Sequence, residues 1–204
     1  MTYYLGLMAI AAMSITGVIA AGKKGMDIIS IILLGVVTAI GGGTLRDIIL
    51  DTNPIFWITD LSYLWVATGA AIFAFFLVPH VKQVKRLLLY ADAFGLSLFG
   101  ILATEGTLNY GFSAPVAVLM GIITGIAGGI LRDLLTIRMP LLTSREFYVT
   151  PILLGSTTFV MLDSWMPGIP YTRTISIAVV FIFRASAIQW KLYYPDWLMY
   201  KRGE

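Results

Sequence analysis

Long apolar runs separated by short polar breaks repeat along the whole chain. Most of these runs approach the roughly 20 residues that a helix needs to cross a hydrocarbon core about 30 Å thick. The breaks, such as "AGKKG", "DTNP" and "WMPGIP", hold the glycines, prolines and charges that favour turns. The pattern predicts seven membrane-spanning helices, at residues 3–21, 27–50, 61–78, 88–105, 114–137, 147–162 and 172–190.

Composition supports an all-α polytopic membrane protein. Of the 204 residues, 58% are hydrophobic and only 12% are charged, whereas an ordinary soluble domain is about 25% charged. The loops are too short for a soluble domain, so we expect one transmembrane domain over residues 1–204. The chain has no cysteine, which excludes disulfides and thiolate metal sites.

Lysine and arginine mark one face of the membrane. They follow the first, third, fifth and seventh predicted helices, at Lys23, Lys24, Lys82, Lys85, Arg86, Arg138, Arg145, Lys191, Lys201 and Arg202. The opposite face holds only Arg173. Because cytoplasmic loops carry an excess of basic residues, we expect the N-terminus outside and the C-terminus in the cytoplasm.

The chain contains an internal repeat. The segment "AIGGGTLRDII" at 39–49 matches "GIAGGILRDLL" at 125–135 with an offset of 86 residues. Without a gap, the same offset pairs Gly25/Gly111, Gly35/Gly121, Thr38/Thr124, Gly42/Gly128, Gly43/Gly129, Arg46/Arg132, Asp47/Asp133 and Pro54/Pro140. This register predicts two three-helix repeats, at about 3–79 and 88–165, with the helix at 172–190 left over.

Three crossings per repeat force the second copy to run inverted relative to the first. Inverted repeats of this kind are typical of transport proteins, whose site lies near the midplane between the two halves. Within each repeat, helical spacing places small and polar residues and an arginine on one face. These residues are Gly35, Thr38, Gly42 and Arg46, and in the second copy Gly121, Thr124, Gly128 and Arg132.

The glycines allow two interpretations. They could let helices pack closely, or they could supply a bend or an unwound turn that lines a cavity. Three consecutive glycines cannot all face one neighbour, so the pattern favours a bend. The expected bend positions are Gly41, Gly42 and Gly43 in the first copy and Gly128 and Gly129 in the second.

The motif charges also allow two interpretations. Arg46 and Arg132 could extend from helix ends towards the interface, or face a polar interior, which we favour. For Asp47 and Asp133 the two interpretations are evenly balanced. Facing that interior, both arginines would structure or gate a pathway between the two repeats.

The other intramembrane polar groups give weaker signals. Asp92 is expected to cap the fourth predicted helix and Glu105 to lie at the interface. Arg184 either extends towards the cytoplasmic side or contacts another subunit. His80 is expected to be a solvated loop residue, and the tryptophans Trp57, Trp65, Trp165, Trp190 and Trp197 are expected to form an aromatic belt.

The sequence gives almost no support for enzymatic chemistry. It has no Walker motif, a single histidine and no metal-ligand cluster. We therefore expect neither catalysis nor a cofactor, and no resident metal. The net charge of +3 comes from basic residues that mark one face of the membrane, so it does not indicate nucleic-acid binding.

The segments "AGKKGMDIISIILLGVVTAIGGGTLRDIIL", "FWITDLSYLWVA", "DAFGLSLFGILATEG" and "GIAGGILRDLL" resemble the prokaryotic branch of the trimeric intracellular cation channels. This family is also known as a glycine-transporter-type domain in two copies. The resemblance implies a homotrimer in the cell (inner) membrane, with one pore per subunit. That pore would pass K⁺ and, more weakly, Na⁺.

By position, the resemblance assigns Gly41, Gly42, Gly43, Gly128 and Gly129 to the bends that shape the pore. It assigns Arg46, Asp47, Arg132 and Asp133 to the motif charges. Two other classes remain open. A secondary transporter for a small amino acid such as glycine fits the inverted repeat equally well, and a non-conducting membrane scaffold would not need matched charges.

Overall fold

The computed structural model describes residues 2–22, 24–166, 171–195 and 197. Seven long helices dominate it: α1 (Thr2–Ala21), α2 (Ile28–Ile49), α4 (Ser62–Leu77), α5 (Val84–Asn109), α6 (Ala114–Leu135), α7 (Val149–Trp165) and α8 (Thr172–Trp190). Three short helices join them: α3 (Phe56–Thr59), η1 (Val78–His80) and η2 (Leu141–Thr143). Each predicted span corresponds to one long helix, which confirms the all-α fold class.

Six of these helices are long and apolar enough to cross a membrane, with η1 continuing α4 to His80. The remaining one, α7, has 17 residues and a length of about 26 Å, at the lower end of what a membrane span needs. Of the basic residues used to infer topology, Lys23, Lys201 and Arg202 lie outside the described residues.

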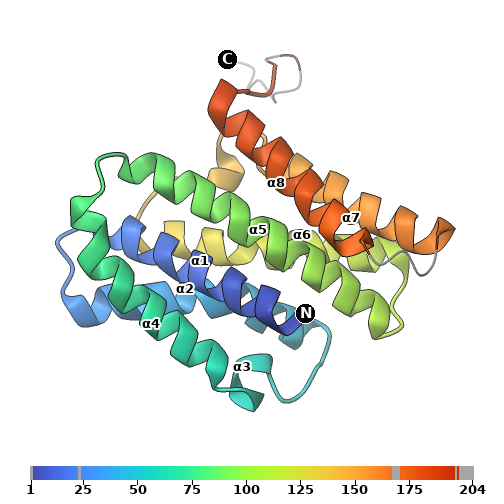
Figure 1. Cartoon of the computed structure of the whole chain (residues 1–204), viewed down its shortest axis with the longest axis horizontal. Coiled ribbons are helices and arrows are strands. Elements are labelled where there is room, and N and C mark those ends of the chain that lie inside the picture. The colour runs from blue at the N-terminus through green and yellow to red at the C-terminus, as the bar shows by residue number, and fades with distance from the viewer. Residues whose placement is uncertain (1, 23, 167–170, 196, 198–204) are drawn as a thin grey trace, which may run out of the picture.

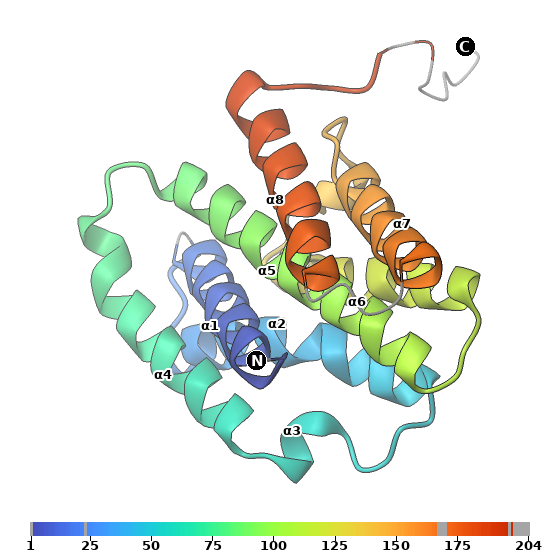
Figure 2. The ribbon, with the colours of Figure 1, turned by 45° about the vertical axis from the view of Figure 1, so that its right-hand side comes forward.

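Four helices form the centre of the molecule. In this group α1 packs against α2 and α5, and α6 packs against both α2 and α5. On one side α4 covers α1 and α2, and on the other side α7 and α8 cover α5 and α6 (Figures 1 and 2). The two motif-bearing helices, α2 and α6, therefore meet in the interior of the fold.

The 86-residue offset is visible in the helix ends. The bounds of α2 and α6 differ by 86 residues at both ends. Gly25 and Gly111 precede these helices with φ of 65° and 86°, a left-handed conformation that glycine adopts without a steric cost. Asp51 and Ile137 follow them with φ of 52° and 51°. The two copies therefore enter and leave their motif helices through equivalent turns.

The N-terminus of α2 is capped by Asp27. Its carboxylate accepts hydrogen bonds from the backbone N–H of Ser30 at 3.0 Å and from the Ser30 hydroxyl at 2.6 Å. These bonds stabilise the charged form and lower the pKa of Asp27 below its ordinary value. The cap fixes where α2 begins and hence where its glycines fall.

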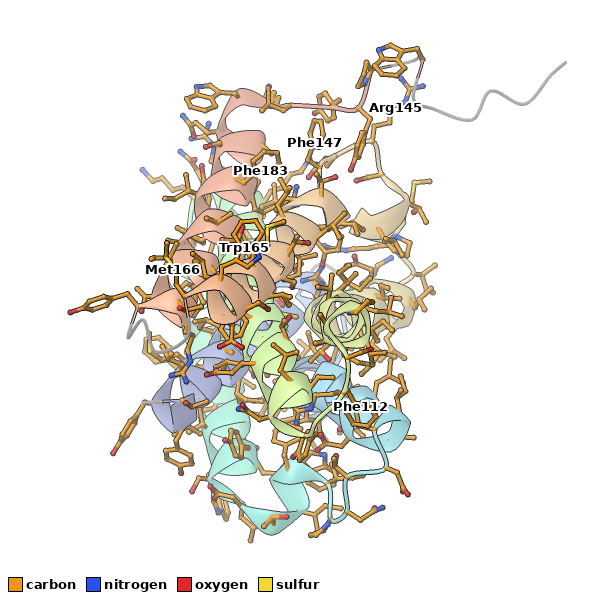
Figure 3. All side chains as sticks on the ribbon, turned by 90° about the vertical axis from the view of Figure 1, so that its right-hand side faces the viewer. Phe112, Arg145, Phe147, Trp165, Met166 and Phe183 are labelled. Atoms are coloured by element: carbon orange, nitrogen blue, oxygen red, sulfur yellow. The ribbon has the colours of Figure 1, made fainter. Side chains whose placement is uncertain are left out.

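Most of the tryptophans are exposed near helix ends. Trp65, Trp190 and Trp197 are exposed, as is Trp165 at the end of α7 (Figure 3). Trp57 differs, because its indole N–H donates to the hydroxyl of Thr44 on α2 at 2.9 Å. The aromatic belt remains a prediction, and Trp57 also has a local role in holding α3 against α2.

Candidate functional site

The two motif helices cross with their backbones in contact. A Cβ atom added to Gly128 would lie 2.5 Å from the carbonyl oxygen of Thr38. A Cβ added to Gly42 would collide in the same way with the carbonyl oxygen of Thr124. These reciprocal contacts relate the two copies, and they leave space for glycine alone at both positions.

The neighbouring glycines each face a different group. A Cβ on Gly41 would lie 2.5 Å from the Leu131 side chain on α6, and one on Gly43 would lie 2.5 Å from the Phe56 ring on α3. Both α2 and α6 remain helical through their glycines. The unwound turn is therefore wrong: three consecutive glycines do pack, because they contact different neighbours. A bend without unwinding remains a prediction.

The second motif forms a buried ionic cluster. Arg132 is fully buried and donates from Nη1 to Asp92 Oδ1 at 2.7 Å and from Nε to Asp133 Oδ1 at 2.9 Å. Asp133 Oδ2 also accepts the backbone N–H of Leu141 at 3.2 Å. With one guanidinium and two carboxylates, the cluster carries a formal charge of −1.

Gly129 makes room for this cluster. A Cβ there would lie 2.7 Å from the Tyr148 hydroxyl, 3.3 Å from Asp92 Oδ1 and 3.6 Å from Arg132 Nη2. Two buried atoms, Asp92 Oδ2 and Arg132 Nη2, have no hydrogen-bond partner among the described residues. An unpaired polar atom in a low-dielectric interior costs free energy, so these two atoms reduce the stability that the cluster contributes.

The first motif is held more loosely. Arg46 donates from Nε and Nη2 to Asp47 Oδ1 at 2.8 and 2.6 Å, and Asp47 Oδ2 accepts the backbone N–H of Phe56 at 2.8 Å. The Arg46 side chain is 21% exposed and lies 5.7 Å from the Phe56 ring centroid. The 86-residue offset places Gly6 at the position of Asp92, so this copy lacks the second carboxylate.

Each motif arginine lines a cavity. Arg46 and Gly6 line one of about 370 Å³, which α1 and α5 also wall. Arg132 and Asp133 line another of about 200 Å³, again walled by α1 and α5. Along α1, the 13 residues from Gly6 in the first cavity to Ile19 in the second span about 20 Å. Two helices, α1 and α5, thus run from one cavity to the other.

Buried side chains fill the region between them. Met13 lies halfway along α1, and its side chain would be 2.6 Å from a Cβ on Gly95 and 3.0 Å from one on Gly128. Thr38 and Thr124 are buried as well. The Thr38 hydroxyl donates to the Leu34 carbonyl at 2.7 Å, whereas the Thr124 hydroxyl has no partner among the described residues.

The expected role of Asp92 is corrected by the position of its helix. Because α5 begins at Val84, Asp92 lies two turns inside it and is fully buried. It therefore does not cap the helix, but pairs with Arg132 instead. One sequence signal pointed this way. The first repeat carries Gly6 at the position of Asp92, so a carboxylate there is not a capping residue common to both repeats.

The expected contact of Arg184 with another subunit is wrong, because the side chain is buried within its own chain, whereas its extension towards the cytoplasmic side stays a prediction. Its side chain is fully buried inside the chain, where Nη2 meets Glu146 Oε2 at 2.9 Å and Nη1 donates to the Phe147 carbonyl at 3.0 Å. Its guanidinium also lies 5.1 Å from the Tyr148 ring centroid. Phe147 in turn packs edge-on against Phe183 at 6.0 Å (Figure 3). No spacing in the sequence links Glu146 to Arg184.

A second interhelical ion pair lies at the other end of α5. Arg173 donates to both carboxylate oxygens of Glu105, at 2.7 and 2.5 Å, and both side chains are partly exposed. The pair ties α8 to α5. Within the described part of the chain, no group of three or more histidine, aspartate or glutamate residues could hold a metal ion.

Comparison with known proteins adds two relationships by sequence. The family model described as Glycine transporter matches residues 3–79 and again residues 89–164. The UPF0126 inner membrane protein YadS of Escherichia coli (strain K12) is 33% identical over 205 residues, covering 100% of this chain and 99% of the relative. The chain is thus similar to an inner membrane protein over its whole length.

Two solved structures share the fold. The TRIC trimeric intracellular cation channel orthologue from Rhodobacter sphaeroides matches with a TM-score of 0.90 at 38% identity, covering 94% of this chain and 98% of that one. A prokaryotic TRIC channel crystallised in 0.5 M KCl matches with a TM-score of 0.87 at 28% identity, covering 93% and 96%. These structures are ion channels, not enzymes. The chain therefore belongs to the family of the TRIC trimeric intracellular cation channels, whose sequence model is described as Glycine transporter.

Proposed function

We propose that this protein is a subunit of a cation channel that passes K⁺ and, more weakly, Na⁺, with one pore inside each chain of a homotrimer. The observation that carries the proposal is the pair of cavities at opposite ends of the α1, α2, α5 and α6 group. Each cavity holds one copy of the same arginine motif. The similar structures are described as cation channels, and two of them as TRIC channels above 30% identity in sequence.

The proposed pathway runs along the small-residue face between these cavities. Where α2 and α6 are in contact, the backbone carbonyls of Thr38 and Thr124 lie at the crossing. Carbonyl and hydroxyl oxygens can replace the water around a potassium ion. Met13, Thr38 and Thr124 close this route at mid-depth, so opening requires Met13 to move or the two helices to shift.

The arginines would act as gating charges rather than as ion ligands. An exposed guanidinium in a cation pathway repels the permeating ion, but a paired one is largely neutralised. Arg132 is held by two carboxylates and Arg46 by one. The proposed gate at the α2 end is therefore the looser of the two, and the cluster at the α6 end is the one that holds the closed conformation.

We also propose an inner-membrane location with the N-terminus outside. The described basic residues that support it are Lys24, Lys82, Lys85, Arg86, Arg138, Arg145 and Lys191. All of these follow odd-numbered spans and so lie on one face, the face expected to be cytoplasmic. In this orientation, the Arg46 cavity opens outside and the Arg132 cavity opens to the cytoplasm.

A secondary transporter for glycine is the alternative function. The description of the matching family model favours it, and an inverted repeat with a mid-depth closure suits alternating access. The cluster at Arg132 could then exchange one of its carboxylates for that of the substrate. The two functions differ in transport rate. Only an open pore passes ions fast enough to give discrete current steps from a single molecule.

One reconstitution experiment separates the candidates. The purified protein is placed in planar bilayers for current recording in potassium, and in vesicles for uptake of labelled glycine. Unitary potassium currents that change in Arg46→Gln and Arg132→Gln support the channel. Saturable glycine uptake without unitary currents would instead support the transporter. If neither signal is observed, the non-conducting scaffold is the remaining candidate. Unchanged currents in both variants would show that neither arginine takes part in gating.

A further inference from the structure

Arg184 of α8 is a fully buried charge that the proposed gate does not use. Because α8 lies outside both repeats, Arg184 has no counterpart in the first repeat. Its guanidinium donates to Glu146 Oε2 and to the Phe147 carbonyl, while its Nε has no partner among the described residues. Burying a charge costs free energy unless its partners compensate, and both partners lie in the segment just before α7.

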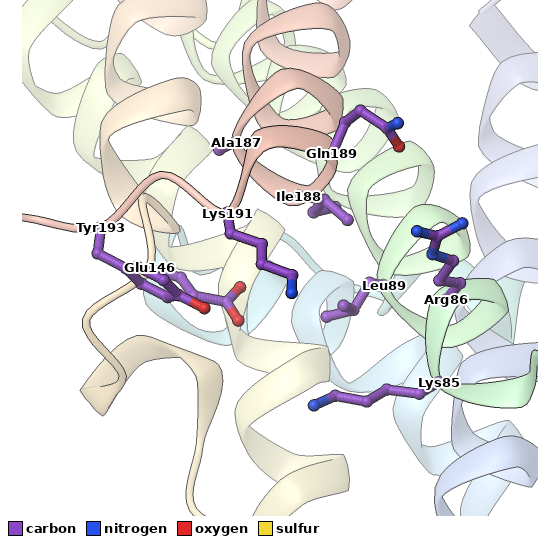
Figure 4. Close-up of a pocket in the computed structure, with 9 residues that line it drawn as sticks. All are labelled: Lys85, Arg86, Leu89, Glu146, Ala187, Ile188, Gln189, Lys191 and Tyr193. Atoms are coloured by element: carbon purple, nitrogen blue, oxygen red, sulfur yellow. The ribbon is translucent and has the colours of Figure 1, made fainter.

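The segment before α7 is also held by the residues that follow α8. Tyr193 forms an antiparallel bridge with Glu146, and Figure 4 shows the two residues side by side. The Tyr194 N–H donates to the Arg145 carbonyl at 2.9 Å. Together with the two contacts of Arg184, these bonds fix the position of the segment relative to α8.

Tyr148, the last residue before α7, joins Arg184 to the buried ionic cluster at Arg132. Its ring centroid lies 5.1 Å from the Arg184 guanidinium, a distance at which a cation is attracted to an aromatic ring. A Cβ on Gly129 would lie 2.7 Å from the Tyr148 hydroxyl. The same point is 3.3 Å from Asp92 Oδ1 and 3.6 Å from Arg132 Nη2. The hydroxyl and the Arg132–Asp92 pair therefore share the space that this glycine leaves open.

The first repeat has a serine in place of this tyrosine. The 86-residue offset places Ser62 at the position of Tyr148 and Asp60 at the position of Glu146. Asp60 accepts the backbone N–H of Ser62 at 2.9 Å, so that polar contact forms within its own turn. The tyrosine is therefore not part of the architecture that the two repeats share, and it occurs beside the motif whose arginine is fully buried.

We propose that Arg184 and Tyr148 are positioning residues for Arg132, through which α8 stabilises the closed arrangement of the ionic cluster. This inference rests on the proposed function, in which that cluster holds the closed conformation. The ion pairs leave Arg132 Nη2 and Asp92 Oδ2 without partners among the described residues, so hydrogen bonding alone does not fix the guanidinium. The Tyr148 hydroxyl occupies the space next to this pair, and a displacement of α8 would withdraw it.

The test uses the absence of cysteine from the chain. A single Leu88→Cys substitution places a thiol on the wall of the Arg132 cavity, at a side chain that is only 7% exposed. A charged, water-soluble methanethiosulfonate modifies this thiol at a rate that follows the population of the open cavity, whether or not ions pass. Unitary currents in planar bilayers are recorded from the same proteins.

Two variants are made in this background. Tyr148→Phe removes only the hydroxyl, and Arg184→Gln releases the segment before α7. Because Tyr148→Phe keeps the ring against Arg184, it decides the outcome if Arg184→Gln does not fold. The matched control is Arg173→Gln, which breaks the other ion pair of α8, with Glu105. That pair lies about 20 Å along α5 from Asp92.

We expect the modification rate and the open probability to rise about two- to tenfold in Tyr148→Phe, the range that the loss of one polar contact gives. Arg184→Gln should raise both at least as much, and Arg173→Gln should leave both at the background value. Added to Asp92→Asn, Tyr148→Phe should change either quantity by less than about twofold, because residues that act through one cluster are not additive.

Three results overturn the proposal: unchanged values in Tyr148→Phe, an equal rise in Arg173→Gln, or the full further rise in the double variant. The proposed function fails separately. If the thiol responds as expected but no variant passes unitary currents, the positioning role stands and the channel does not. If the background protein passes unitary currents that Tyr148→Phe leaves unchanged, the channel stands and the positioning role does not.

Discussion

Replacing Gly128 by alanine tests the contact between α2 and α6 directly. The added Cβ would lie 2.5 Å from the Thr38 carbonyl oxygen, whereas ordinary van der Waals contact begins at 3.4 Å. The obstacle is backbone, so no side-chain rotation relieves it, and the helices must separate by about 0.9 Å. Overpacking of this kind typically costs about 1–3 kcal/mol. We therefore expect the free energy of unfolding of Gly128→Ala to be about 1–3 kcal/mol lower than that of the wild type.

The assay is denaturant unfolding of the purified protein in mixed micelles, with Gly69→Ala as the matched control. Gly69 also lies inside a membrane-spanning helix, but a Cβ there would meet nothing within 4 Å. The control should be as stable as the wild type or slightly more so, because alanine favours helix. If Gly128→Ala unfolds like Gly69→Ala, the backbones of α2 and α6 are not in contact at this crossing.

The remaining predictions concern the gate. Gly6→Asp places a carboxylate beside Arg46 in the first cavity, and should lower the open probability in single-channel recording; Gly6→Ala should not. Asp92→Asn weakens a buried pair with Arg132, so the free energy of unfolding should fall by about 1–3 kcal/mol and the open probability should rise; an unchanged unfolding curve would contradict this. Met13→Ala removes a buried side chain between the cavities and should cost about 2–5 kcal/mol in stability while increasing unitary conductance. Wild-type conductance in Met13→Ala would mean that the pathway lies elsewhere.

The helices could be predicted because their signals are local. Apolar length and the glycine and proline breaks fixed seven spans, and α2 begins and ends within one residue of the expected range 27–50. The start of α5 was missed by four residues, because Lys85 and Arg86 near an interface do not end a helix. That error also made Asp92 look like a capping residue.

The site could be predicted only in part, because pairing across helices has no local signal. The repeat identified Arg46, Asp47, Arg132 and Asp133, and both Arg–Asp neighbours do pair within each motif. Spacing along the chain could not show that Asp92 would reach Arg132 across 40 residues. Nor could it show that consecutive glycines would face separate neighbours on α6 and α3, which decides between packing and unwinding.

The most direct test of the central claim is single-channel recording of the purified protein in a planar bilayer with unequal KCl concentrations on its two sides. A cation-selective pore predicts unitary currents whose reversal potential shifts towards the potassium equilibrium potential. It also predicts that the shift grows when Na⁺ replaces K⁺ on the dilute side, because Na⁺ permeates more weakly than K⁺. A reversal potential at the chloride value, or saturable glycine uptake without any unitary current, would contradict the account.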